Sequence, residues 1–522
     1  MDASILTLLV FVPVAGAVGL LFVPRAQAER IKWIAAGVAG LQLLLAIWLW
    51  VAFEPASAAM QFEVQAAWIP SFNIEYHLGV DGLSMPLVFL TALLSLISIV
   101  ASWKIDKSPK GYFSLFLLLD AGMMGVFVAL DFFLFYVFWE VMLLPMYFLI
   151  GMWGGPQRTY AAIKFFLFTL FGSVLMLLAM LALYFYSEPH TFNLMTLIAE
   201  APKIDAQLWG LDIKWLIWVA LFVGFAIKVP IFPFHTWLPL AHVEAPTAVS
   251  VILAGVLLKM GTYGLLRISF PLLPGETIGF AFMLAVLAVI NIIWGAANAI
   301  AQTDLKRMVA YSSISHMGFV LLGMAAVVGQ NTAAAQAGMN GAVLQMFNHG
   351  IITAMLFLLV GVIYDRAHHR YIVYPKNYED EALRGKLGFG GLAANLPVFS
   401  GFVALAFFAG LGLPALSAFI SEVMCFIGGF SAFRTLTIIA TLGILLNATY
   451  FLRAFQRIFF GELNEKWAGL SDMSPREIGL LAPLAALVLF LGVYPRPVLD
   501  VISATMNQLV ATFAPLLQMA VQ

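Results

Sequence analysis

The chain has 522 residues, of which 63% are hydrophobic and only 10% are charged, and its formal net charge is −1. A soluble domain typically carries about 25% charged residues, so this composition predicts a surface that faces lipid over most of its area. The near-zero charge excludes a nucleic-acid binder, which needs a basic face, and the single Cys425 excludes an internal disulfide.

Apolar runs of about 20 residues, the length that crosses a bilayer as a helix, recur along the whole chain. They predict an all-α polytopic membrane protein with about 14 transmembrane helices. The tail at 497–519 contains Asp500 and is expected to form a membrane-surface helix, with a fifteenth span as the alternative. The fourteen spans are expected near 4–23, 33–53, 82–103, 111–130, 132–153, 162–187, 214–236, 246–270, 277–300, 305–329, 338–364, 390–430 (one broken element), 433–458 and 478–494.

The first apolar run, 3–23, has one feature of a cleaved signal peptide, because Ala26-Gln27-Ala28 follows it. However, Met1-Asp2 is acidic rather than basic, and the run exceeds the usual apolar core of about 7–15 residues. We therefore expect a retained first span.

The loops between these spans divide the basic residues very unevenly. With the N-terminus outside, 19 of the 26 Lys and Arg residues fall in cytoplasmic loops. Basic residues concentrate on the cytoplasmic side of membrane proteins, so the asymmetry supports the span count. It predicts that both termini lie on the non-cytoplasmic side of the membrane, which we expect to be a bacterial inner membrane. The five basic residues expected on that side are Lys203, Lys214, Arg267, Arg434 and Arg496.

Two charged residues lie within spans near proline. Charged groups cost about 2.5–3.5 kcal/mol at a bilayer centre and usually face a bundle interior. Glu140 precedes Pro145, which leaves the Val141 carbonyl without its helical donor. Lys228 precedes Pro230 and Pro233, which free the Ala226 and Val229 carbonyls and predict a helix break that lines water or protein. The alternatives are a structural carboxylate for Glu140 and a lysine that reaches the membrane surface for Lys228.

Three further candidates lie in the next spans. Lys259 is in mid-span, His316 shares a helical stripe with serines, and His349 has Gln345 and Thr353 four residues away on either side. A lone buried histidine is more often a packing residue than a proton carrier. Because these two lie on adjacent spans and each has polar helical neighbours, both interpretations stay open.

A second break is expected at 410–416, where Pro414 frees the Gly410 carbonyl and Glu422 follows on the second half. The alternative places Glu422 at the aqueous end of that half. His235, His242 and Glu244 end the seventh span, where capping or interfacial roles are at least as plausible as proton relay.

Broken helices at corresponding places in two halves point to inverted repeats around a central pathway. We interpret 111–270 and 277–458 as two five-helix repeats, whose breaks at 228–235 and 410–416 are counterparts. An N-terminal three-helix region, 1–110, and a C-terminal span with an amphipathic tail, 459–522, flank them.

These residues resemble the antiporter-like family of proton-pumping NADH–quinone oxidoreductase (respiratory complex I), over residues 80 to 460. Within that family, Glu422 is similar to the glutamate of M-type chains, where L-type and N-type chains usually carry lysine. The chain also lacks the C-terminal arm of the L type. One departure is the stretch after Pro414, which has fewer glycines than the family pattern. The matching stretches are Phe138-Trp139-Glu140 with Pro145, Lys228-Val229-Pro230, His235-Thr236-Trp237-Leu238-Pro239, Ala241-His242 through Glu244-Ala245-Pro246-Thr247, Asp304-Leu305-Lys306-Arg307, Tyr311 through His316, and Phe347-Asn348-His349.

The resemblance implies fourteen spans, two inverted repeats and a proton route driven by redox chemistry on other chains. It assigns proton transfer to a Glu140–Lys228 pair, a central Lys259, His316, His349 and an exit residue, Glu422. It implies no cofactor and no metal on this chain, with NADH, FMN, iron–sulfur clusters and quinone on partner chains. The expected partners are other membrane subunits, including sister antiporter-like chains, together with lipid and protons.

Two other functions remain open from the sequence. A chain of a monovalent cation/proton antiporter or of a membrane-bound hydrogenase shares Glu140 and Lys228. An independent small-solute secondary transporter predicts ligand-shaped polar groups clustered at one depth, whereas the buried groups here are spread over many helices.

Overall fold

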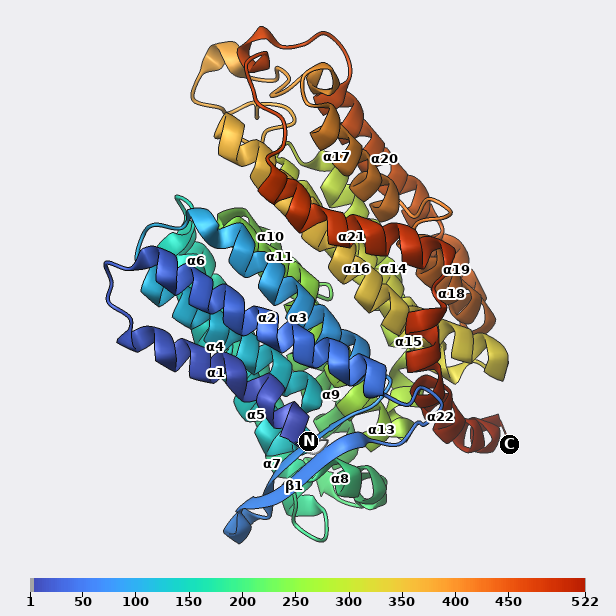
Figure 1. Cartoon of the computed structure of the whole chain (residues 1–522). Helices are drawn as coiled ribbons and strands as arrows, with labels where there is room; N and C mark the ends of the chain where they lie inside the picture. The colour runs from blue at the N-terminus through green and yellow to red at the C-terminus, as the bar shows by residue number, and fades with distance from the viewer. Residues whose placement is uncertain (1–3, 522) are drawn as a thin grey trace.

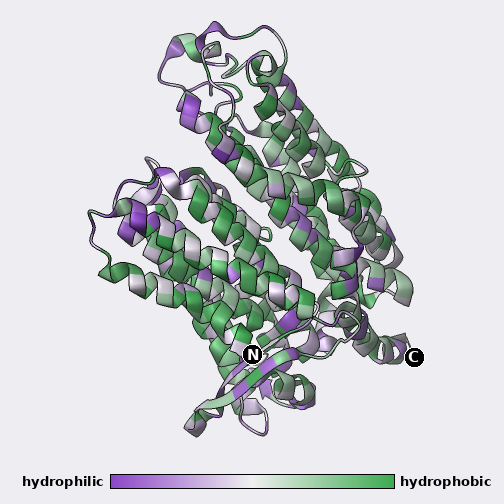
Figure 2. Ribbon diagram, viewed as in Figure 1, coloured by the Kyte–Doolittle hydropathy of each residue, from purple (hydrophilic) through white to green (hydrophobic). Residues whose placement is uncertain are grey.

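The structure is a computed structural model that describes residues 4–521 as a bundle of long helices (Figure 1). Met1 and Asp2, on which the expectation of a retained first span partly rests, lie outside the described residues. Apolar residues cover the helices and polar residues concentrate at the two ends of the bundle (Figure 2). This distribution is the one that a bilayer selects, since lipid surrounds the helices and water surrounds the loops.

Twelve helical segments among residues 4–521 are long and apolar enough to cross a membrane. They coincide with twelve of the fourteen expected spans. The other two expected spans, 214–236 and 390–430, are each divided into shorter helices by the breaks predicted from proline.

The first half of the chain contains thirteen described α-helices. Their bounds are α1 Ile5–Phe22, α2 Ala28–Ala52, α3 Ser84–Ala101, α4 Pro109–Val128, α5 Phe132–Val141, α6 Leu143–Trp153, α7 Arg158–Tyr186, α8 Leu194–Glu200, α9 Ile213–Lys228, α10 Trp237–Glu244, α11 Thr247–Ile252, α12 Leu258–Gly264 and α13 Phe270–Leu272. Two π-helical turns, η6 Leu253–Leu257 and η7 Leu265–Ser269, join α11, α12 and α13 into one span.

The second half contains nine described α-helices, of which α16 is buried along its most apolar stretch. Their bounds are α14 Pro274–Ala301, α15 Leu305–Ala325, α16 Thr332–Ala367, α17 Pro397–Gly410, α18 Ser417–Ala432, α19 Arg434–Ala440, α20 Leu442–Phe459, α21 Pro475–Val493 and α22 Arg496–Val521.

The loop at 54–81 forms an antiparallel hairpin that the span analysis did not predict. Strand β1 (Gln61–Ile69) pairs with β2 (Ile74–Val80), with Val64 opposite Leu78. The hairpin could have been predicted from the alternation of apolar and polar residues in both segments, around a turn at Pro70–Phe72. A second, two-residue pair joins β3 (Gln207–Leu208) to β4 (Leu211–Asp212).

The C-terminal helix α22 is not among the twelve span candidates within residues 4–521. It packs on α16, and its Thr505 hydroxyl accepts a hydrogen bond from the Gly82 N–H at 3.0 Å, beside the hairpin. Figure 1 shows α22 at the same end of the bundle as β1. These observations agree with a surface helix rather than a fifteenth span.

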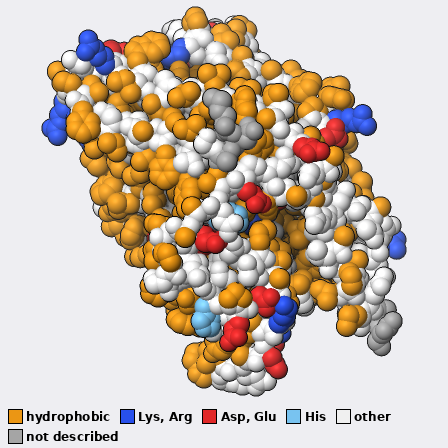
Figure 3. Space-filling view, turned by 60° about the horizontal axis from the view of Figure 1, so that its bottom comes forward, with side chains coloured by type: hydrophobic (Ala, Val, Ile, Leu, Met, Phe, Trp, Pro, Cys, Tyr) orange, Lys and Arg blue, Asp and Glu red, His pale blue; other side chains and the backbone are white. Residues whose placement is uncertain are grey.

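The hairpin end of the bundle carries several acidic side chains near the middle of its face (Figure 3). Three basic residues counted among the loops, Lys32, Arg267 and Lys306, are in fact buried. Arg267 lies in η7, where it is 6% exposed and forms an ion pair with Asp81. Lys306 is 4% exposed. Their environments depend on packing between distant segments, which loop counting does not detect.

Candidate functional site

A row of polar side chains lies in the interior of the helix bundle, on helices α5, α9, α10, α12, α15, α16 and α18. Glu140 is partly buried and the others are buried. The structure separates the six residues singled out from the sequence into two groups. The first contains Glu140 and Lys228, and the second contains Lys259, His349, His316 and Glu422.

The first group joins Glu140, in the last turn of α5, to Lys228, the last residue of α9. The Lys228 ammonium lies 4.9 Å from the centroid of the Trp139 ring, and the residue is 2% exposed, so it does not reach the membrane surface. Glu140 interacts electrostatically with Lys228, although the described atoms form no ion pair within 4.0 Å. One Glu140 carboxylate oxygen is buried without a hydrogen-bond partner among residues 4–521.

Protein groups provide hydrogen-bond partners for the backbone at the break after Lys228. The Ala226 carbonyl, expected to be free, accepts a hydrogen bond from the Ile231 N–H at 2.8 Å. The buried Asn291 of α14 accepts one from the Phe232 N–H at 2.8 Å and donates one to the Pro230 carbonyl at 3.3 Å. An unsatisfied backbone group would cost several kcal/mol in an apolar interior, so Asn291 stabilises the break. Sequence analysis did not identify Asn291.

Lys259 begins the second group and is fully buried. The π-helical turn η6 precedes it, a feature that often marks functional sites. Its ammonium donates a hydrogen bond to the Ala254 carbonyl at 2.6 Å and lies 2.6 Å from Nδ1 of His349. When the ammonium is charged, Nδ1 must accept, so His349 carries its own proton on Nε2.

The group continues through both histidines to Glu422. The rings of His349 and His316 are 5.7 Å apart between centroids. His316 Nδ1 lies 3.2 Å from Glu422 Oε1, and the Gln345 amide donates to the same oxygen at 3.4 Å. Each histidine therefore has a polar partner at Nδ1, whereas both Nε2 atoms are buried without a hydrogen-bond partner in the described chain.

The second break positions the Glu422 carboxylate. Gly412 has φ +78°, and a Cβ at this position would lie 2.7 Å from Glu422 Oε2. Only glycine combines that backbone conformation with so close an approach. Ala415 also has a positive φ, of 71°. One glycine at the contact point thus suffices, although the stretch is poorer in glycine than the family pattern. Glu422 is 5% exposed, so it does not lie at an aqueous end.

His242 is a member of the row that sequence analysis left as a capping or interfacial residue. It is fully buried in α10, stacks on Phe357 with centroids 4.5 Å apart, and has no hydrogen-bond partner for either ring nitrogen in residues 4–521. It interacts electrostatically with Lys259 and with Lys306. The sequence offered one indication that His242 is buried: prolines flank the short segment that forms α10 on both sides.

Lys306 links His242 to the end of the bundle that carries the basic loops. Its ammonium donates a hydrogen bond to the Ala245 carbonyl at 2.5 Å. Burial, aided by Lys466, lowers the pKa of the loop residue His369 to about 4, so that histidine is neutral at pH 7. The adjoining pocket has a volume of about 430 Å³, and its polar lining includes Glu244, Asp304, Lys306, His368, His369 and Arg370.

His235 and Glu244 have structural contacts. His235 Nε2 accepts a hydrogen bond from the Trp294 indole at 3.2 Å. The Glu244 carboxylate accepts one from the Gln157 N–H at 2.8 Å and so holds the loop before α7. These contacts agree with the structural roles considered from the sequence.

Comparison with known families matches two parts of the chain. Residues 129–447 match the family model described as NADH:quinone oxidoreductase/Mrp antiporter, TM. Residues 33–130 match the model for NADH-ubiquinone oxidoreductase chain 4, amino terminus.

Full-length relatives agree with these matches. The chain is 41% identical to NADH-quinone oxidoreductase subunit M of Rhodobacter capsulatus, covering 98% of this chain and 97% of the relative. It is 40% identical to NAD(P)H-quinone oxidoreductase chain 4 1 of Synechococcus elongatus, covering 97% and 91%. The fold matches a chain of respiratory complex I from Thermus thermophilus with bound NADH, at a TM-score of 0.82, 29% identity and coverage of 98% and 100%.

Proposed function

The chain belongs to the NADH:quinone oxidoreductase/Mrp antiporter family, as a proton-translocating membrane subunit of NADH–quinone oxidoreductase, and on that premise we propose that protons cross it along the buried row. The observation that carries the proposal is the sequence of contacts from Lys259 through His349 and His316 to Glu422. The identity of its relatives favours this function over that of a cation/proton antiporter chain or a small-solute transporter.

The hydrogen-bonding pattern defines the proton steps. The Lys259 ammonium gives a proton to His349 Nδ1, and His349 releases its Nε2 proton. His316 takes up a proton at Nε2 and passes its Nδ1 proton to Glu422. A water molecule bridging the two unpartnered Nε2 atoms is needed to carry the proton between the rings, whose centroids are 5.7 Å apart. Rotation or re-protonation of the rings then restores the starting state.

Glu140 and Lys228 carry protons in the first group of the row. The turn that carries Lys228 packs against the turn that carries Lys259: a Cβ on Gly261 would lie 2.8 Å from the Phe225 carbonyl and 2.9 Å from the Val229 nitrogen. A change in the charge of Glu140 alters the stability of the Lys228 ammonium, because the two groups interact in a low-dielectric interior.

His242 and Lys306 supply protons to Lys259 from the 430 Å³ pocket. The pocket lies at the end of the bundle where the basic loops gather, and His242 interacts electrostatically with both Lys306 of its lining and Lys259. This branch makes the pocket the uptake side and Glu422 the release side.

The chain is divided into two inverted repeats, 111–270 and 277–458, flanked by 1–110 and 459–522. The first repeat contains Glu140, Lys228 and Lys259, and the second contains His316, His349 and Glu422. Each repeat contains one broken helix beside a titratable residue of the row: α9 ends at Lys228, and α18 carries Glu422 just after its break. This correspondence supports the repeat boundaries.

Replacing either histidine by glutamine tests the row. The expected result is that His316→Gln and His349→Gln lose most proton uptake per electron in liposomes that contain the purified complex, because glutamine keeps polarity but cannot carry a proton. NADH oxidation with an uncoupler should remain. His235→Gln is the matched control, since His235 lies outside the row. Normal coupling in both row variants would contradict the proposal.

The partners of the chain are proposed to be sister antiporter-like subunits, with FMN, iron–sulfur clusters, NADH and quinone bound by other chains of the complex. The same purified complex tests this assignment, because flavin and iron–sulfur spectra should accompany this chain through purification.

The chain is placed in a bacterial inner membrane with both termini on the non-cytoplasmic side. The basic-residue asymmetry and the position of α22 beside the hairpin support this orientation. A reporter fused after residue 380 is expected to read as cytoplasmic, and one fused at the C-terminus as external. An external signal from the fusion after residue 380 would show that the orientation is the opposite one.

A further inference from the structure

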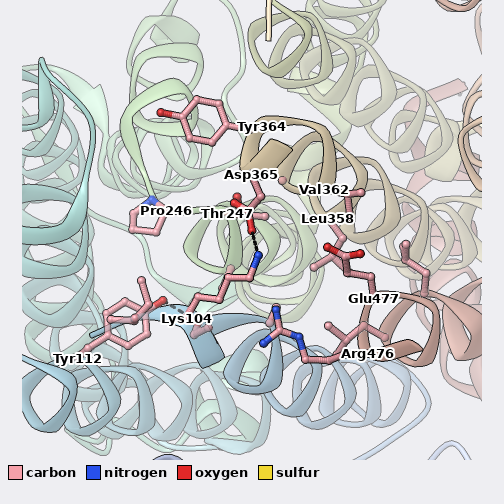
Figure 4. Close-up of a pocket in the computed structure, with 17 residues that line it drawn as sticks. Lys104, Tyr112, Pro246, Thr247, Leu358, Val362, Tyr364, Asp365, Arg476 and Glu477 are labelled. Atoms are coloured by element: carbon pink, nitrogen blue, oxygen red, sulfur yellow. Dashed lines mark hydrogen bonds and ion pairs between the residues drawn. The ribbon is translucent and has the colours of Figure 1, made fainter. Parts of the chain in front are cut away.

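A pocket of about 260 Å³ lies between α3, α4, α11, α16 and α21, and none of its lining residues belongs to the buried row (Figure 4). Lys104 is the last residue of the third span, and Arg476 lies in the first turn of the last span. The pocket therefore lies at the depth where helices leave the membrane, which is the depth of lipid headgroups.

The charges of the pocket leave one cation without a partner. Lys104 forms an ion pair with Asp365 at 2.8 Å, and Glu477 binds the Arg366 guanidinium through both carboxylate oxygens at 2.7 and 2.9 Å. Arg476 is half-buried and has no hydrogen bond or ion pair with any residue between 4 and 521. Figure 4 shows its guanidinium beside the Lys104 side chain.

The remaining walls are mostly apolar. Leu358 and Val362 of α16 and Leu480 and Leu481 of α21 line the pocket. Ser102 supplies a hydroxyl at the wall, where it is hydrogen-bonded to the Tyr112 hydroxyl at 2.9 Å. A free inorganic anion would pair with Arg476 but leave these apolar walls uncovered, and an acyl chain alone would leave the guanidinium unpaired.

We propose that this pocket binds an anionic phospholipid, with its phosphate at Arg476 and Lys104 and the first methylenes of one acyl chain between α16 and α21. Basic pockets between spans at the membrane surface are suited to acidic headgroups. The pocket is smaller than a whole lipid, so the rest of both chains extends into the bilayer. The lipid bridges α3 of the N-terminal region and α21 of the C-terminal region.

Native mass spectrometry of the purified complex tests the site. Detergent-washed complex is supplied with phosphatidylglycerol or phosphatidylcholine, and the lipid retained by this subunit is measured. Wild type is expected to retain one tightly bound phosphatidylglycerol at this site. In Arg476→Gln the affinity for that lipid should fall about fivefold, since a basic residue near the headgroup contributes about 1 kcal/mol. Ala101→Leu, which fills the pocket without changing charge, should weaken retention as well.

Arg25→Gln is the matched control, because Arg25 is an exposed cation in a loop and does not line the pocket. It should retain the lipid as wild type does. Equal retention of phosphatidylcholine, or an equal loss in Arg25→Gln, would overturn the proposal. Displacement of the lipid by inorganic phosphate at equal concentration would show a free-anion site instead, and a cross-link from position 101 to another protein chain would show that protein covers the pocket.

Discussion

Glu140→Gln or Lys228→Ala is expected to reduce proton uptake by the complex to below about a tenth of the wild-type value, since a positioned proton-transfer group typically contributes at least about a hundredfold. Lys228 is 2% exposed and its recorded charge partner is Glu140. Removing the carboxylate takes away the charge that stabilises the ammonium, and removing the lysine takes away the proton carrier itself. Charge reversal of either residue should be worse than neutralisation, because it places like charges in a low-dielectric interior.

The measurement is NADH-driven proton uptake in liposomes, compared with electron transfer in the presence of an uncoupler and with the subunit content of the purified complex. Glu188→Gln and Lys203→Ala are matched controls, because both residues are exposed and distant in sequence from the row. Full pumping by either row variant would contradict the proton-transfer roles assigned to Glu140 and Lys228. Loss of assembly would instead favour a structural carboxylate or a packing role.

Glu422→Gln is expected to lose a comparable share of pumping, because it keeps the hydrogen-bonding shape but cannot receive the proton of His316. Glu422→Asp keeps a carboxylate and should retain a larger share than glutamine, although its shorter side chain lengthens the 3.2 Å contact. Glu422→Lys should pump poorly. It puts a second cation in the row that already contains Lys259, and no negative charge faces His316.

Gly412→Ala provides a second test of Glu422 that leaves the carboxylate itself in place. The added methyl group would meet Glu422 Oε2 at 2.7 Å in a backbone conformation that alanine rarely adopts. The carboxylate must move away from His316, so pumping should fall while the complex still assembles. Gly401→Ala is the control, since nothing lies within 4 Å of a Cβ there. Normal pumping by both Glu422→Gln and Gly412→Ala would place the exit elsewhere.

Local chemistry is enough to locate the spans and their breaks. Twelve of the fourteen expected spans match continuous helices, because the length of an apolar run is a property of the chain alone. Pro230 and Pro414 mark the two breaks for the same reason: a proline removes its own backbone donor wherever it stands. The identities of Glu140, Lys228, Lys259, His316, His349 and Glu422 were likewise visible as polar residues inside apolar runs.

The contacts among these residues depend on the tertiary structure. Lys259 and His349 are 90 residues apart in sequence, and their 2.6 Å contact depends on the rotation and depth of α12 against α16. Apolar periodicity does not encode that pairing, because many helix pairings bury the same apolar area. The same reason explains why His242 was left outside the row and why Arg267 was counted in a loop, although Asp81 holds it in the interior.

The sequence by itself therefore determined the class of the protein, its membrane crossings and the polar residues that must be buried, since each follows from the cost of polar groups in lipid. Only the tertiary structure decided which of those groups touch, that Glu140 and Lys228 interact without an ion pair within 4.0 Å, and that Asn291 stabilises the first break. Hydrogen bonds form over about 3 Å and require specific atoms to meet, so they depend on how segments distant in sequence pack together.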